Sequence, residues 1–217
     1  MKIYMMEQKS KDWFEIRRWK LTASNWQAIW NVWKWLDTYV VEVMSDYYSS
    51  WVEDNFISRD MQKGIDLEPL AREEYELVTG NKVTEVGFIE YDEYVWCSPD
   101  GLVGEDGWVE IKCLKDTNYF KIILNGESEI DTKHIWQMQM NMLITGRQWW
   151  DYVVYCPNYE RNIITFRIYP DSKQQAKLLE WFEIGKQKIE AIKKIIGTPN
   201  KVEKIIVTDD DKKNELF

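Results

Sequence analysis

Two carboxylates and one amine stand close together in the middle of the sequence, at Asp100, Glu110 and Lys112. Glu110 and Lys112 are two positions apart in an apolar run that favours a strand, so their side chains point to the same face. Val109 and Ile111 alternate with them and point to the other face, towards a core. Asp100 stands at an Asp-Gly turn, and a hairpin turn further along the chain would bring it back beside Glu110.

This set of side chains suits a hard metal cation. Mg²⁺ prefers oxygen ligands, keeps several waters and takes one or two protein carboxylates, here Asp100 and Glu110, with the backbone carbonyl of Ile111 as a further ligand. Water activated by the ion would attack a phosphodiester, and Lys112 would orient that water, help to deprotonate it or offset the developing negative charge. On spacing alone, an ordinary turn beside a solvated Glu/Lys strand face remains an equally good interpretation.

Composition limits the class of protein. The chain has 217 residues, of which 45% are hydrophobic, so we expect one domain over residues 1–207 and a flexible charged tail over residues 208–217. It shows no secretory signal and no apolar run near the roughly 20 residues of a membrane span. The three cysteines form no CxxC pair, which predicts free thiols and a cytoplasmic protein, in the host cell if a phage encodes it.

A net charge of −9 argues against non-specific coating of DNA but allows an enzyme with a local basic groove.

The predicted elements form a mixed α/β or α+β domain, with a central mixed sheet flanked by helices, a helical N-terminal part and a long C-terminal helix. Residues 12–61 read as helical, with one helix starting at Asp37, and a helix over residues 66–79 has Pro69 in its first turn. The other predicted elements are strands over residues 82–91, 94–98, 107–113, 149–155 and 163–169, and helices over residues 118–125, 132–145 and 171–196.

The sequence resembles a known nuclease motif. An Asp, about ten residues and then Glu-apolar-Lys is similar to the PD-(D/E)xK motif, which Pro99-Asp100 and Glu110-Ile111-Lys112 match in full. Over residues 13–155 the chain resembles the lambda exonuclease and YqaJ-type viral recombinase family. Four further blocks carry this resemblance: residues 13–17 with 21–24; Gly64 with Glu68 and residues 71–72; residues 83–85 leading into 97–101; and His134 with Gln137 and Gln139 before residues 150–155. The resemblance implies a restriction-endonuclease-like core.

The resemblance also implies metal and catalytic roles. Asp100 and Glu110 correspond to the metal carboxylates, and Lys112 corresponds to the catalytic lysine. Glu68 corresponds to an acidic residue that assists a second metal ion, although a first-turn helix residue favoured by the macrodipole is the alternative. Gln137 corresponds to the glutamine of the helix after the motif. Since Gln137 and Gln139 are two positions apart on a predicted helix, only one of them can face the site directly.

A phosphate clamp is implied near the N-terminus. Arg17 and Ser24 match residues that hold the 5′ phosphate of the strand being cut, and the hydroxyl of Thr22 completes a guanidinium-plus-hydroxyl set. A surface cation and helix caps are the alternatives for these residues. His134 stands where lambda exonuclease has a tyrosine, so the resemblance assigns it no role. Trp33 and Trp35 are core residues or, alternatively, stack on unpaired bases.

The activity implied by the resemblance is a 5′-to-3′ exonuclease of double-stranded DNA in a phage-type recombination system. It would use Mg²⁺, with Mn²⁺ as a substitute and two ions per site, and leave 3′ overhangs for a single-strand annealing protein. The family implies a homotrimeric ring around the DNA with a locally basic channel. Two alternatives stay open: a structure-specific or nicking endonuclease of the same fold, and a non-catalytic DNA-end or protein-binding module.

Overall fold

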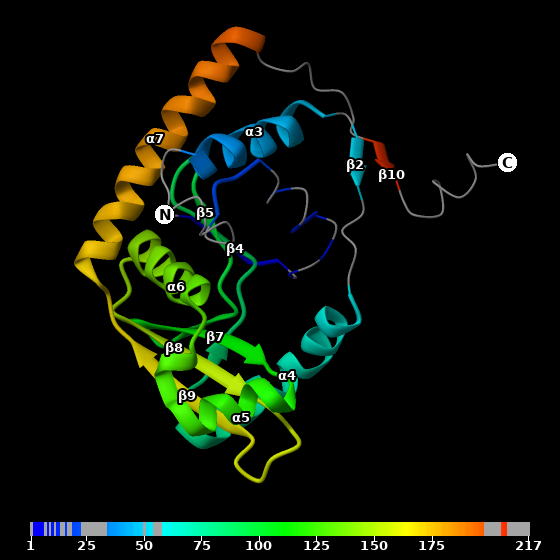
Figure 1. The fold of residues 1–217 in the computed structure, drawn as a ribbon, viewed down its shortest axis with the longest axis vertical. Coiled ribbons are helices and arrows are strands. Elements are labelled where there is room, and N and C mark those ends of the chain that lie inside the picture. Colours follow the sequence, from blue (N-terminus) through cyan, green and yellow to red (C-terminus); the bar gives the residue numbers. More distant parts are fainter. Residues whose placement is uncertain are drawn as a thin grey trace, which may run out of the picture.

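A computed structural model of the chain describes residues 2–6, 8, 10, 12–13, 16, 19–22, 34–49, 51–53, 58–197 and 205–207. Figure 1 shows a central sheet with helices on both of its faces and the long helix α7 (Ser172–Ile196) along one side of the molecule. Within the described ranges, no helix combines the length and the apolar character needed to cross a membrane.

The central sheet has five strands in the order β3-β6-β7-β8-β9. Their bounds are Val83–Thr84, Gly101–Val103, Gly107–Cys113, Trp149–Tyr155 and Ile163–Ile168. The two central strands, β7 and β8, run parallel, and all the other neighbours in this sheet pair antiparallel. The sheet is therefore mixed, as the sequence predicts.

Helix α4 (Arg59–Thr79) covers one face of this sheet. Its buried side chains belong to the apolar cluster Ala71, Tyr75, Val103, Val109, Ile111, Val153 and Tyr155. The prediction that Val109 and Ile111 face a core is confirmed. Glu110 and Lys112 consequently lie on the opposite side of β7.

Helix α6 (Thr132–Thr145) covers the opposite face, where Trp108 and Trp150 stack with ring centroids 5.4 Å apart. Helix α7 packs against α6 and against α3 (Lys34–Tyr48), as Figure 1 shows. A short helix, α5 (Asp116–Asn125), and a 3₁₀ turn (Gly126–Glu129) connect β7 to α6. This arrangement places β7 between two helical layers.

A second, three-stranded antiparallel sheet lies beside the first. Its strands are β1 (Lys2–Tyr4), β4 (Phe88–Glu90) and β5 (Trp96–Cys97), and α6 packs against β4 and β5. Gly87 lets the N-terminal segment approach closely, because a Cβ there would lie 2.3 Å from the side chain of Met6. Two further strands, β2 (Trp51–Glu53) and β10 (Ile205–Val207), pair in parallel.

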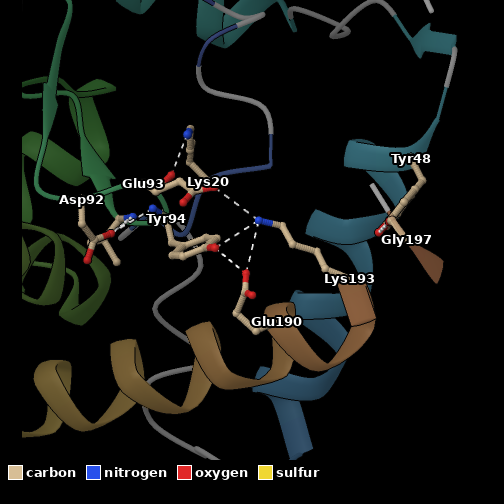
Figure 2. A network of polar contacts seen from close by, with 9 residues as sticks. Lys20, Tyr48, Asp92, Glu93, Tyr94, Glu190, Lys193 and Gly197 are labelled. Atoms are coloured by element: carbon tan, nitrogen blue, oxygen red, sulfur yellow. Dashed lines mark hydrogen bonds and ion pairs between the residues drawn. The ribbon is translucent and has the colours of Figure 1, made fainter. Parts of the chain in front are cut away.

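Polar contacts tie the segment before β5 to α7 and to the N-terminal part of the chain (Figure 2). Nζ of Lys193 donates to the Tyr94 hydroxyl at 3.1 Å and lies 3.3 Å from a carboxylate oxygen of Glu93. The Tyr94 hydroxyl donates to Glu190, one turn earlier on α7. Nζ of Lys20 donates to the backbone carbonyl of Glu93 at 2.7 Å. The N-terminal segment is thereby anchored beside β5.

Most of the predicted architecture is confirmed. The predicted elements over residues 107–113, 132–145 and 149–155 coincide with β7, α6 and β8. Asp171 caps α7, because its carboxylate accepts from the backbone N–H of Lys173 and Gln174. The long C-terminal helix and the helical layers on both faces of the sheet follow the prediction.

The predicted start of the helix before β3 is wrong. Helix α4 begins at Arg59, with the Ser58 hydroxyl accepting from the backbone N–H of Met61, so Pro69 lies inside the helix and not in its first turn. Because proline costs a helix one hydrogen bond, the sequence favours a helix boundary near Pro69. The N-cap and the packing of Tyr75 on the sheet outweigh that cost.

Several other predicted elements also need correction. The single strand expected over residues 82–91 is two strands in different sheets, separated at Gly87, where the N-terminal segment crosses. Residues 51–53 form β2 and are not helical, and α3 begins at Lys34 and not at Asp37. Strand β6 was not predicted, because three residues are too few to show an alternating pattern. The predicted tail, residues 208–217, lies outside the described residues.

Candidate active site

Glu110 is the centre of the polar cluster on β7. Its carboxylate Oε1 accepts a hydrogen bond from Nζ of Lys112 at 2.6 Å and another from Nε2 of Gln137 at 2.9 Å. The residue is only 1% exposed, so the carboxylate is held between β7 and α6. The predicted convergence of Glu110, Lys112 and Gln137 is therefore found.

Asp100 lies beside this cluster, as the predicted hairpin requires. Its Oδ2 accepts a hydrogen bond from the backbone N–H of Ile111 at 2.7 Å. Strand β6 pairs with β7 only as far as Val109, so the Asp100 side chain takes the place that a longer β6 backbone would occupy. Gly101 permits the close packing behind it, because a Cβ there would lie 2.2 Å from the side chain of Val83.

The two carboxylates present the donor set of a hard cation. Oε2 of Glu110 is buried and has no hydrogen-bond partner among the described residues, and an unpaired buried carboxylate oxygen is costly unless a cation or water satisfies it. No group of three His, Cys, Asp or Glu side chains in the described part of the chain could hold a metal ion by itself. Mg²⁺ takes only one or two protein carboxylates and keeps several waters, so Asp100 and Glu110 fit its needs.

The charged groups of the cluster shift each other's pKa values. Burial and the nearby Glu110 carboxylate raise the pKa of Asp100 to about 8. Burial opposes the positive charge of Lys112, but the carboxylates of Glu110 and Asp100 outweigh it and raise the pKa of the lysine. A carboxylate pair that is costly to ionise without a cation is typical of a site that binds one.

Glu68 approaches the same site from α4. It lines the cavity that also contains Asp100 and Glu110, and Arg72, one turn later on α4, pairs with its carboxylate at 3.3 Å. Arg72 also pairs with Glu85, so the guanidinium bridges two acids beside the site. The structure thus brings Glu68 to the predicted place and adds Arg72 as its partner, a contact that the four-residue spacing on a helix could have indicated.

The two glutamines of α6 face different ways, as expected from their spacing. Gln137 faces Glu110, whereas Gln139 is buried on the other side, where its amide donates to the Tyr169 carbonyl at 2.8 Å and its Oε1 accepts from the backbone N–H of Asp171 at 2.8 Å. Gln139 therefore joins α6 to the start of α7.

His134 lies at the margin of the cluster. Its Nδ1 is 2.9 Å from the hydroxyl of Tyr152. Burial, together with the charges of Lys112 and Lys133, lowers its pKa to about 3, so the imidazole is neutral near pH 7. This is the single His of the chain, and it contacts a tyrosine rather than the carboxylates.

A cavity of about 300 Å³ is lined by Glu68, Asp100, Glu110, Ile111, Lys112 and Gln137. Besides the residues already described, its lining includes Gln8, Trp13, Thr22, Phe88, Trp96, Cys97, Ser98 and Asn141. Thr22 is held there by its backbone N–H, which donates to the Tyr39 hydroxyl at 3.0 Å. Arg17, Ser24 and Trp33, and the side chain of Trp35, lie outside the described residues.

Sequence reasoning missed part of this lining. Gln8 bridges two carbonyls, those of Val86 and Pro99, with its amide at 2.8 and 2.7 Å. Asn141 lies one turn beyond Gln137 on α6. Its four-residue spacing from Gln137 was the available signal, since residues i and i+4 share a helix face.

The chain matches the family model of the YqaJ-like viral recombinase domain over residues 12–148. No curated protein matches it. Among solved structures, it is similar to an alkaline exonuclease, LHK-Exo, from Laribacter hongkongensis, with a TM-score of 0.72 and 31% identity over 85% of this chain and 97% of that one. The structure of LHK-Exo in complex with dAMP gives a TM-score of 0.72 and 30% identity over the same shares.

A phage related exonuclease from Haemophilus somnus 129PT shares the fold, with a TM-score of 0.55 and 16% identity over 91% of this chain and 97% of that one. The predicted restriction-endonuclease-like, PD-(D/E)xK-type core is thereby confirmed as the fold. Because the family model matches well over half of the chain and LHK-Exo is 31% identical across 85% of it, the chain belongs to the YqaJ-like viral recombinase family.

Proposed function

We propose that this protein is a metal-dependent 5′-to-3′ exonuclease of double-stranded DNA that leaves 3′ single-stranded overhangs. Its family and its similarity to an alkaline exonuclease make it a DNA exonuclease in the broad sense. The metal dependence, the direction of cutting and the product go beyond what the family shows, and we propose them here.

One observation carries the metal-dependent part. Glu110 is 1% exposed, binds Lys112 and Gln137 through one carboxylate oxygen, and has its other oxygen buried without a partner in the described structure, beside Asp100. A buried glutamate with a purely structural role would have a hydrogen-bond partner for each of its carboxylate oxygens. This geometry supports a cation between the two carboxylates.

The residues of the site then have distinct tasks. Asp100 and Glu110 hold Mg²⁺, for which Mn²⁺ substitutes, and the Ile111 carbonyl is a further ligand, since the N–H of the same residue already faces Asp100. Glu68, which lines the same cavity, assists a second ion in this proposal. When bound, the metal polarises water and the phosphodiester.

Lys112 and Gln137 act on the reacting groups. The ammonium of Lys112 is the one positive side chain in the described lining of the cavity, so it orients the attacking water and offsets charge that develops on the phosphate. Gln137 fixes the Glu110 carboxylate through its hydrogen bond to Oε1.

The direction of cutting depends on the phosphate clamp. Thr22 lines the cavity, so a hydroxyl is available at the N-terminal side of the site. Arg17 and Ser24 complete the clamp in this proposal and bind the 5′ phosphate of the strand that is degraded.

The oligomeric state and the protein partner are inferred from the family. We infer a homotrimeric ring around the duplex, with a basic channel that overcomes the net charge of −9, and a single-strand annealing protein that receives the 3′ overhang. We also place the protein in the cytoplasm. A ring predicts a mass in solution near three times the 26.2 kDa of the chain.

The decisive experiment uses end-labelled linear duplex DNA with either 5′-phosphate or 5′-hydroxyl ends, with and without Mg²⁺. Release of labelled mononucleotides from the 5′-phosphorylated ends, only with Mg²⁺, is the expected result. Covalently closed circular DNA serves as the matched control and is expected to remain intact.

The other outcomes would each change part or all of the proposed function. Equal cutting of closed circles would indicate a structure-specific or nicking endonuclease. Tight binding of DNA ends without any cleavage would indicate a non-catalytic DNA-end module. Digestion that does not depend on the 5′ phosphate would remove the clamp from the proposal but leave the metal site.

A further inference from the structure

Helix α6 directs two amide side chains into the cavity. Gln137 and Asn141 are four residues apart, so they lie on the same face of the helix, one above the other. Both line the cavity that contains Asp100 and Glu110. The amide of Gln137 is used within the protein, because it donates to Glu110.

Asn141 is different from its neighbours on the helix. It is 1% exposed, and its Nδ2 has no hydrogen-bond partner among the described residues. Gln139, which is 2% exposed on the same helix, has both its amide nitrogen and its carbonyl oxygen bonded to the backbone of the α7 entry. The helix therefore holds one satisfied and one unsatisfied buried amide.

An unsatisfied buried amide is costly. Leaving such a donor unpaired typically destabilises a protein by about 1–3 kcal/mol, and most buried polar groups in folded proteins are paired for this reason. A leucine would fill nearly the same space without that cost. An asparagine that lines a reaction cavity and lacks a partner among the described residues is therefore best explained by a ligand.

The chemistry of the cavity indicates which group the amide binds. Phosphate oxygens accept hydrogen bonds and donate none, whereas the carboxylates of Asp100 and Glu110 are directed to the cation. A strand bound for cleavage at Glu110 brings phosphates into the cavity, which contains the Thr22 hydroxyl as well as Asn141. The Nδ2 amide group of Asn141 carries two N–H donors, which match acceptor oxygens of this kind.

We propose that Asn141 contacts the substrate, with its side-chain amide donating a hydrogen bond to a phosphate oxygen of the bound DNA strand. This assignment rests on the proposed nuclease function and adds a residue to it. The contact is neutral, so it adds affinity for phosphate without disturbing the charge balance between Lys112 and the two carboxylates.

Two variants of nearly the same shape test the assignment. Asn141→Leu removes the donor and the unpaired group, and Asn141→Asp replaces the donor with an anion that repels phosphate. Affinity for a 5′-phosphorylated duplex is measured by fluorescence anisotropy with Ca²⁺ in place of Mg²⁺, kcat and KM are measured with Mg²⁺, and the thermal midpoint is measured without DNA.

The expected result for Asn141→Leu is a thermal midpoint equal to or above that of the wild type, with Kd raised and kcat/KM lowered by about 10- to 100-fold. Asn141→Asp is expected to lose at least as much affinity. Gln139→Leu is the matched control on the same helix, and the opposite pattern is expected: a lower thermal midpoint, with Kd and kcat/KM within about twofold of the wild type.

A purely structural role has a clear signature. If Asn141→Leu lowers the thermal midpoint and leaves Kd and kcat/KM within twofold of the wild type, the assignment is wrong, even though the wild type degrades DNA. If the wild type binds the duplex but does not cleave it, the proposed nuclease function fails, and the ratio of the Kd values still decides whether Asn141 contacts phosphate. If the wild type does not bind the duplex at all, both proposals are overturned.

Discussion

Nζ of Lys112 lies 2.6 Å from Oε1 of Glu110, with a single residue between them on β7. The pair is unequal, because the lysine side chain is 28% exposed while the glutamate is 1% exposed. Lys112 can therefore follow the reacting groups in the cavity, whereas the Glu110 carboxylate is fixed by β7 and α6. This asymmetry gives the two residues separable roles, which can be tested one at a time.

Replacement of Lys112 by alanine should abolish cleavage but retain most of the DNA binding. The variant removes the one cation in the described lining of the cavity and leaves both carboxylates in place. We expect a fall in kcat of at least about 10²-fold, the magnitude seen when a single charge-stabilising donor is lost. Single-turnover digestion, together with anisotropy for binding, measures the two effects separately.

Lys82→Ala is the control for a lost positive charge. Lys82 is 85% exposed, pairs only with Glu76 in the described structure, and does not line the cavity. Its kcat should match that of the wild type. Activity of Lys112→Ala equal to that of this control would show that the catalytic cation lies elsewhere.

Glu110→Gln should remove the stabilisation of the fold by Mg²⁺. A ligand that binds only the folded state stabilises it by about 2.7 kcal/mol at a concentration one hundred times Kd. The wild type should therefore show a higher thermal midpoint with Mg²⁺ than with a chelator, and the Glu110→Gln variant should show no difference. Glu127→Gln, on the exposed 3₁₀ turn, should behave as the wild type.

A Mg²⁺-dependent shift that persists in Glu110→Gln would contradict the proposed ligand set. In that case the ion binds away from β7, and the buried, unpaired oxygen of Glu110 would need another explanation. Calorimetric titration with Mg²⁺ gives the number of ions bound, and hence tests the proposed second ion near Glu68.

The sequence alone predicts the strands and helices that carry the site. Strand β7 and helix α6 end at clear signals and have strong periodicity, so Glu110, Lys112 and Gln137 could be placed on the correct faces before the fold was known. The turn at Asp100 was also placed correctly, because a strand hairpin leaves little choice for the returning chain.

The rest of the site depends on contacts between distant parts of the chain. Its spacing puts Asn141 on the same helix face as Gln137, but the packing of α6 against β4 and β5 is what places that part of the face in the cavity. The split between β3 and β4 is set by the N-terminal segment that crosses at Gly87, which no local pattern records. Gln8 lies some ninety residues before its partner Pro99, so its position could not be read from spacing.

His134 should not titrate between pH 5 and 8. Burial and the charges of Lys112 and Lys133 lower its pKa from 6.5 to about 3, against the smaller opposite effect of Asp131. Since this is the only histidine in the chain, its imidazole C–H resonances are unambiguous in an NMR titration. Chemical shifts that stay constant from pH 8 to pH 5 are expected, and a midpoint near 6.5 would contradict the buried Tyr152 contact.

The same shift predicts how stability depends on acid. Because the folded pKa of His134 is below the unfolded value, its contribution is complete above about pH 6.5 and is lost as the pH falls towards 3. Between pH 6.5 and 5, the wild type should lose roughly 1.5 kcal/mol more than a His134→Gln variant. Urea unfolding at the two pH values measures this difference.

Lys20 gives a dependence of the same sign in the alkaline range, where stability rises with pH. Its Nζ lies 3.4 Å from the ring centroid of Trp19 and 4.5 Å from that of Trp96, and the residue is 7% exposed. Burial lowers its pKa from 10.5 to about 8. The nearby carboxylates of Glu90 and Glu93 raise the pKa, but they offset only part of the effect of burial. Lys193 adds to the lowering, and Asp92 opposes it.

A Lys20→Met variant isolates this effect, because methionine keeps the contact with both indole rings. Below pH 8 the lysine is charged in the folded and unfolded chains, so the wild type bears the full cost of the buried charge. Between pH 8 and 10.5 the folded protein loses the proton first, and the stability of the wild type relative to Lys20→Met should rise by roughly 3 kcal/mol. Guanidinium unfolding of both proteins at pH 7.5 and pH 10 measures the change. A constant difference between the two proteins would mean that Lys20 is charged throughout, with the hydrogen bond to the Glu93 carbonyl and the two aromatic rings replacing its lost hydration.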